Sequence, residues 1–271
     1  MKRPFLAFLV HVLVVFSALA ADAPPGQRPK LTDGSLFIPV GFKGNATGEF
    51  DLTLHLHGAP GIVEENFEVA KCPGVLATVT LPGLSAVYTE RFKDTNTFWR
   101  ILREVEAQLK RSGAPVPRVG RVTVTSFSAG FGGVREMLND SNIFARIDAI
   151  VMADSIYAGF AGEPAERKVN SVNMEGFLRF AREATERRKR LLVSHTQLRT
   201  PNYASTVETA DYLVAQLGGQ REAATEDWPG GLKLLSRFRK GQCEILGFDG
   251  DTGAHHMQHL RQLSLFLERL K

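Results

Sequence analysis

Short apolar runs and longer apolar stripes of helical spacing alternate along most of the chain. Apolar residues occupy every second position over 49–57, which predicts a strand with one buried face. Other β-type runs cover 35–40, 75–81, 122–127, 147–153, 190–194 and 243–248. Helical spacing predicts helices over about 94–110, 133–138, 174–187, 206–217 and 256–270, while 232–238 fits either type. Because strands and helices alternate, we expect an α/β fold with a mostly parallel central sheet and helices on both faces.

The first twenty residues differ from the rest. Lys2 and Arg3 precede an apolar run over 5–16, and residues 18–20 offer an A-x-A cleavage site. This pattern predicts a secretory signal peptide over 1–20, whereas the alternative, a membrane anchor, needs a longer span of about 20 apolar residues. We therefore expect a secreted or periplasmic protein with no stable membrane span after signal cleavage. Residues 21–34 are rich in proline, glycine and charge and predict a flexible leader, which leaves 35–271 for the folded domain.

The charge pattern does not favour a nucleic-acid partner. The formal net charge of +4 falls to +2 when Lys2 and Arg3 leave with the signal peptide. No block of basic residues is interleaved with aromatic residues, and the basic run 187–190 ends a predicted helix, where a solvated face is expected. The two cysteines, Cys72 and Cys243, lack metal-ligand spacing, and the sequence leaves open whether they form a disulfide.

One stretch, 122–133, carries the strongest chemical signal. It begins as a β-branched run, reaches Ser-x-Ser-x-Gly around Ser128, and continues into a segment that predicts a helix. A serine at a sharp turn from strand to helix is typical of a nucleophile elbow, because the turn exposes the hydroxyl above the sheet edge. Ser126 stands where the usual motif has its first glycine, so a small residue is retained. An ordinary strand–helix junction is the alternative interpretation.

The order of three residues along the chain resembles that of the α/β-hydrolase family. Ser128, Asp154 and His256 each follow a predicted strand, in the order nucleophile, acid, base that the family uses. The segment 57–61, His-Gly-Ala-Pro-Gly, is similar to the family's His-Gly oxyanion loop, although a strand-ending turn has the same composition. The resemblance implies an α/β-hydrolase fold, a Ser-Asp-His triad, no cofactor, and an oxyanion site built from the backbone N–H groups of Ala59 and Ala129.

The base has three candidates on one predicted helix. With about 100° per residue, His256 falls roughly 20° from the centre of the apolar face, His259 about 80° and His255 about 120°. A histidine that faces the sheet at the start of the helix can approach the edge where Ser128 lies. We therefore expect His256 to be the base, with a buried structural histidine as the alternative.

The acid occupies a less usual position. The family often has its carboxylate after the next strand, but the corresponding loop, 194–203, contains no Asp or Glu. Asp154 directly follows the strand 147–153, a position that some members of the fold use. We expect Asp154 to orient the imidazole, with Asp249 and Asp251 as alternatives close to His256 in sequence.

These residues predict a secreted serine hydrolase that acts on ester or related acyl bonds of a small-molecule or lipid-like substrate. An acyltransferase with the same triad and a non-catalytic binding protein of the same fold remain alternatives. A metal site is a third, because His55 with His57 and His255 with His259 have ligand-like spacings. Residues 157–173 are too few for a large lid, so we expect an open site with Tyr157 and Tyr203 as substrate-binding wall residues.

Overall fold

A mixed sheet of eleven strands runs through residues 23–114 and 116–271, the part of the chain that this computed structural model describes. Six central strands are parallel, in the spatial order β5-β4-β6-β7-β8-β11. They are β4 (Glu49–Leu56), β5 (Val75–Val79), β6 (Arg118–Phe127), β7 (Ala149–Ala153), β8 (Arg190–His195) and β11 (Cys243–Phe248). The mostly parallel sheet expected from the sequence is therefore confirmed.

Antiparallel strands extend both edges of the sheet. At one edge β3 (Gly34–Pro39) pairs with β5 and carries β1 (Gly26–Gln27) and β2 (Lys30–Leu31). At the other edge β10 (Lys233–Lys240) pairs with β11, and β9 (Glu222–Asp227) pairs with β10. Residues 232–238, which fitted either type of element, thus lie mostly in a strand.

The expectation of a flexible leader over 21–34 is wrong from Gly26 onward. Residues 26–27 and 30–31 form strands, and the buried Asp33 carboxylate binds the guanidinium groups of Arg91 at 2.9 Å and Arg100 at 2.7 Å. These ion pairs and strand hydrogen bonds fix a segment whose composition alone suggests disorder. The signal peptide predicted over 1–20 lies outside the described residues.

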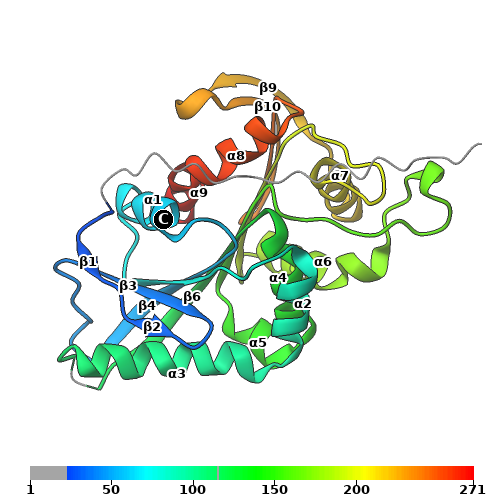
Figure 1. The fold of residues 1–271 in the computed structure, drawn as a ribbon. Helices are drawn as coiled ribbons and strands as arrows, with labels where there is room; N and C mark the ends of the chain where they lie inside the picture. The colour runs from blue at the N-terminus through cyan, green and yellow to red at the C-terminus, as the bar shows by residue number, and fades with distance from the viewer. Residues whose placement is uncertain (1–22, 115) are drawn as a thin grey trace, which may run out of the picture.

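Helices cover both faces of the sheet (Figure 1). One face carries α2 (Ser85–Lys93), α3 (Asn96–Arg111), α4 (Phe131–Asn139), α5 (Ser141–Arg146), α6 (Glu175–Thr185) and α7 (Thr206–Gln216). The opposite face carries α1 (Pro60–Val69), α8 (Gly253–Arg261) and α9 (Leu263–Leu267), which pack against one another. The first and last α-helices described, α1 and α9, therefore share one face of the sheet.

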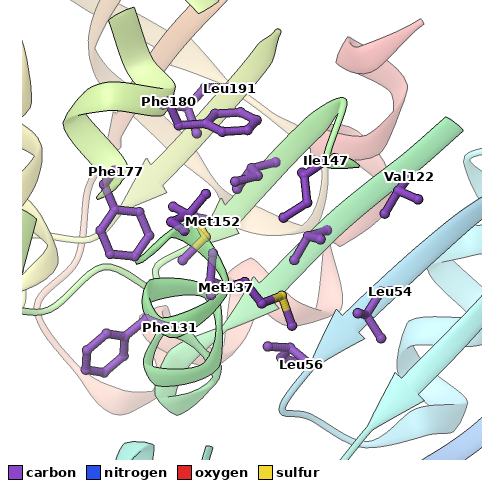
Figure 2. Packing of buried hydrophobic residues seen from close by; sticks show 14 of the residues in the cluster. Leu54, Leu56, Val122, Phe131, Met137, Ile147, Met152, Phe177, Phe180 and Leu191 are labelled. Carbon is purple, nitrogen blue, oxygen red and sulfur yellow. The ribbon is translucent and has the colours of Figure 1, made fainter. Parts of the chain in front are cut away.

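Apolar side chains fill the space between the sheet and each helical layer. Figure 2 shows Leu54, Leu56 and Met152 of the central strands packed against Met137 of α4, with Phe177 of α6 nearby. All five side chains are fully buried or nearly so. Because both faces of the parallel strands are covered, the sheet forms a rigid platform for the loops at its carboxyl edge.

Several elements depart from expectation. The helices α1 and α2 and the strand β9 were not predicted, and the terminal helix is divided at Gln262, whose φ of −110° and ψ of 25° are not helical. Cys72 and Cys243 are both free thiols, Cys243 being fully buried. Among the helices described, none is both long enough and apolar enough to span a bilayer.

Candidate active site

Three neighbouring parallel strands each end in a residue with left-handed backbone. His57 follows β4 with φ of 68°, Ser128 follows β6 with φ of 47°, and Asp154 follows β7 with φ of 46°. This conformation costs a non-glycine residue about 1–2 kcal/mol, and such strain concentrates at functional sites. Since adjacent strands lie about 4.8 Å apart, the three residues gather at one edge of the sheet.

Ser128 lies at an abrupt turn between β6 and the α4 layer. Phe127 still has extended backbone, with φ of −117° and ψ of 142°, and Ser128 begins the short 3₁₀ turn that leads into α4. Gly130 must be glycine, because a Cβ there would overlap the carbonyl oxygen of Leu56 on β4. The turn therefore presents the half-buried Ser128 at the carboxyl edge of the sheet.

A chain of two hydroxyl groups supports this turn. Ser155 Oγ donates a hydrogen bond of 2.9 Å to the carbonyl oxygen of Ser128, and Ser126 Oγ lies 2.7 Å from Ser155 Oγ. The serine that replaces the motif's first glycine is thus fully buried and bonded. Ser155 was missed from the sequence, since nothing in its immediate surroundings distinguishes it from a loop serine.

The structure brings His256 and Asp154 together across 102 residues of sequence. His256 Nδ1 lies 2.7 Å from Asp154 Oδ2, and the His256 side chain keeps 14% of its surface exposed while Asp154 keeps 1%. The imidazole also stacks on the ring of Phe127, the residue before Ser128, at a centroid distance of 4.5 Å. His256, Asp154 and Ser128 therefore lie around the end of β6.

Asp154 is held from both sides of its carboxylate. The backbone N–H and the hydroxyl of Thr196 donate to it at 3.0 Å each, and the Thr206 hydroxyl donates to Oδ1. Burial by itself raises the pKa of a carboxyl group, but the hydrogen bonds from His256 and Thr206 hold the pKa of Asp154 well below its usual range. The group is ionised at neutral pH, and it accepts the Nδ1 proton of His256.

The other candidates for base and acid have different contacts. His255 caps the start of α8 through Thr252, and His259 is fully buried with Nδ1 2.8 Å from Ser194 Oγ. We expected His256 to face the core more directly than His259, but His259 is fully buried while His256 stays partly exposed. The order is reversed because the helix breaks at Gln262, so the later leucines do not define the buried face of α8. Asp249 accepts from the N–H of Gly250, and Asp249 and Asp251 are both exposed.

The segment 57–61 bends into the start of α1. Gly58 has φ of 131°, which only glycine adopts readily, and its carbonyl oxygen accepts a 2.7 Å hydrogen bond from Thr80. Pro60 is the first residue of α1, a favoured proline position. Gly61 has no positive φ and open space around it, so the bend of this segment depends on Gly58 and not on Gly61.

Ala59 and Ala129 both stand at the beginnings of helical segments. Ala59 is the N-cap of α1, and Ala129 follows Ser128 in the turn that opens α4. The first N–H groups of a helix have no acceptor within it, and the helix dipole favours negative charge there. The neighbouring strands β4 and β6 are each followed by the start of a helix, and both starts can offer N–H donors to an anionic oxygen.

An aromatic row extends from the serine turn. Phe131 lies three residues after Ser128, its ring is 5.3 Å from that of Tyr157, and Tyr157 is 5.6 Å from Tyr203. Tyr203 is 43% exposed, and an isolated bridge between Ala158 and Ala204 ties the two tyrosine loops together. The ring planes meet at 52° and 73°, so the row is a series of inclined rings with Tyr203 as its exposed end.

Three other histidines near the carboxyl edge of the sheet are fully buried, namely His55, His195 and His259. Burial lowers the pKa of His55 to about 4, of His195 to about 3 and of His259 to about 4, so all three are neutral at pH 7. Within 23–114 and 116–271, no group of three or more His, Cys, Asp or Glu could hold a metal ion. His55 instead contacts the Thr125 hydroxyl and the His57 carbonyl oxygen, each at 2.7 Å.

A cavity of about 970 Å³ lies elsewhere. Phe42, Phe50 and Leu109 are among its lining residues, at the amino ends of the central strands. The triad candidates lie at the carboxyl ends, where open α/β sheets bind their ligands. Because strand ends, strained backbone and titratable groups coincide at the carboxyl edge, we assign the candidate site there and not to this cavity.

Solved structures with the same fold include known esterases. Enterobactin esterase from Shigella flexneri, solved in the presence of enterobactin, superposes with a TM-score of 0.54 at 13% identity over 92% of this chain and 59% of that chain. Siderophore hydrolase EstB from Aspergillus nidulans superposes with a TM-score of 0.50 at 11% identity, over 93% of this chain and 96% of that chain. The chain thus spans about three fifths of the Shigella enzyme.

No protein-family model matches the sequence, and comparison with curated proteins gives no match. At 11–13% identity the superpositions concern the fold. The chain has the α/β-hydrolase fold, as its sequence resemblance implied.

Proposed function

We propose that this chain is a serine esterase in which Ser128 is the nucleophile, His256 the general base and Asp154 the acid that orients it. The 2.7 Å hydrogen bond between His256 and a buried, ionised Asp154 beside the serine turn carries this proposal. The fold shared with two enzymes named as an esterase and a siderophore hydrolase supports ester hydrolysis as the reaction.

The hydrogen bond between His256 and Asp154 supports one role for each atom. Because ionised Asp154 accepts the Nδ1 proton, Nε2 of the neutral His256 ring carries a lone pair and can remove the Ser128 hydroxyl proton. Ser128 Oγ then bonds to the ester carbonyl carbon, and the Ala59 and Ala129 N–H groups stabilise the negative oxygen. The alcohol leaves with the proton from His256, and water releases the acyl group by the same steps in reverse order.

The aromatic row supports a small-molecule ester with an aromatic or lipid-like apolar group. Tyr157 and Tyr203 would contact that group, since the row begins beside Ser128 and ends at an exposed ring. Export to the periplasm or medium stays part of the proposal through the signal-peptide pattern of 1–20.

A fluorophosphonate probe tests the function directly. We expect covalent labelling of the wild-type protein, no labelling of Ser128→Ala, and wild-type labelling of Ser141→Ala, which changes an exposed serine on α5. Hydrolysis of p-nitrophenyl acetate is expected to follow the same pattern and to survive a chelator. Undiminished hydrolysis by Ser128→Ala, or complete loss of activity with a chelator, would contradict the proposal.

A further inference from the structure

Of the three left-handed residues at the carboxyl edge of the sheet, only His57 has no role in the proposed triad. It lies at the end of β4, next to Gly58 and Ala59, and its left-handed backbone is sterically costly for a non-glycine residue. Its backbone N–H donates to Val79 at 3.1 Å, and its carbonyl oxygen lies 2.7 Å from His55 Nε2. The main chain of His57 is therefore fully bonded inside the protein.

The side chain is bonded at one ring nitrogen. His57 Nδ1 lies 3.1 Å from the hydroxyl of Tyr88, a fully buried residue of α2. That hydroxyl accepts the Leu81 N–H at 2.9 Å, so its own proton remains to be donated. The Leu81 carbonyl oxygen is 3.5 Å away and His57 Nδ1 is closer, which favours donation to Nδ1.

A ring that accepts at Nδ1 and is neutral carries its proton on Nε2. Burial, together with nearby His256, lowers the pKa of His57 to about 4, so the ring is neutral at pH 7. Among the described residues Nε2 has no protein partner, and the side chain is only half-buried. One N–H donor of His57 is thus left unused beside the proposed oxyanion loop.

The His57 ring is also linked to the proposed base His256 through the ring of Phe127. It stacks on Phe127 at 6.2 Å with an interplanar angle of 21°, and Phe127 stacks on His256 at 4.5 Å. Phe127 directly precedes Ser128, so both imidazole rings stack on the residue next to the proposed nucleophile.

We infer that His57 contacts the substrate: its Nε2–H donates a hydrogen bond to an oxygen of the ester bound at Ser128, and Tyr88 acts as a positioning residue that fixes this tautomer. The inference rests on the proposed esterase function and adds a side-chain donor to the backbone donors of Ala59 and Ala129. It explains why a histidine occupies a left-handed position where glycine would be free of strain.

Kinetics of four single variants and one double variant test this role. We expect His57→Asn and His57→Gly to lower kcat/KM for p-nitrophenyl acetate about tenfold, the effect of losing one neutral hydrogen bond to the substrate. The glycine variant also leaves the buried Tyr88 hydroxyl without its nearer acceptor, so its melting temperature should fall. Added imidazole should restore His57→Gly. Tyr88→Phe should lower kcat/KM in the wild-type background and have no further effect on His57→Gly. Arg187→Gly, a left-handed exposed position far from the site, is the control and should keep full activity.

Nitrogen NMR of the histidine rings gives an independent readout, because it reports the tautomer without turnover. The expected proton position on His57 is Nε2 in the wild type, with loss of that preference in Tyr88→Phe. A proton on Nδ1, or wild-type kinetics in both His57 variants, would overturn the inference. If the wild-type protein neither reacts with the fluorophosphonate nor cleaves esters, the proposed function fails instead, whatever the tautomer.

Discussion

Replacing Asp154 by asparagine tests the triad at its most constrained point. Oδ1 accepts from the Thr196 N–H and the Thr206 hydroxyl, and Oδ2 accepts from His256 Nδ1 and the Thr196 hydroxyl. The backbone N–H of Thr196 cannot rotate away, so the asparagine oxygen must stay at the Oδ1 position. Its NH₂ group then faces His256 and forces Nδ1 to become an acceptor.

The expected result is a large loss of activity with a small loss of stability. With Nδ1 as acceptor, the proton of the neutral ring moves to Nε2, which can no longer take the Ser128 proton. A triad with this defect loses about 10⁴-fold in kcat, equivalent to about 5 kcal/mol of transition-state stabilisation. The Thr196 hydroxyl can turn to accept from the new NH₂ group, so we expect the free energy of unfolding to fall by less than about 2 kcal/mol.

Initial rates with p-nitrophenyl acetate and thermal melts of Asp154→Asn give both quantities. Asp227→Asn, an exposed aspartate on β9, is the matched control and should retain wild-type values. A variant that melts like the wild type and keeps kcat within tenfold would refute the assignment of Asp154. The role would then pass to Asp249, after β11.

Three further outcomes follow from the packing and the ionisation states. Thr206→Val removes one of four donors to the acid and should lower kcat several-fold, far less than Asp154→Asn, in the same assay. Gly130→Ala should cost several kcal/mol in denaturant titrations, because its Cβ overlaps backbone of β4, whereas Gly253→Ala, in open space at the start of α8, should stabilise by about 0.5–1 kcal/mol. Equal effects of the two alanines would disprove the packing argument. The three buried histidines have folded pKa values below the ordinary 6.5, so the unfolded chain gains protons first as the pH falls, and each should cost about 2 kcal/mol of stability by pH 5. Melting temperatures that do not change between pH 7 and pH 5 would contradict this.

Much of the fold follows from local pattern. The alternation over 49–57 corresponds to β4, and the β-branched run before Ser128 corresponds to the end of β6. The helix α1 was missed because Pro60 and Gly61 suggest a turn, although proline fits the first position of a helix. The strand β9 was missed because its exposed, polar sequence has no buried face, and pairing with β10 alone determines it.

The candidate site was less accessible from sequence, since its geometry depends on distant contacts. Ser128, Asp154 and His256 could be selected from their order and strand ends. The hydroxyls around Asp154 come from the loop residue Thr196 and from Thr206, the first residue of α7, and no sequence spacing connects them to it. Tyr88 follows the strand 75–79 and could be expected near this edge, but its contact with His57 depends on the packing of the unpredicted helix α2.

The loop between β8 and α7 has a consequence for engineering. Hydrogen bonds from Thr196 and Thr206, at its two ends, to one carboxylate fix both ends, while residues 197–203 between them supply no group that handles protons. If the proposed function is correct, substitutions at Tyr203 between these anchor points should change substrate choice. The proposed triad would keep its alignment, because Thr196 and Thr206 hold Asp154 and residues 197–203 donate no hydrogen bond to its carboxylate.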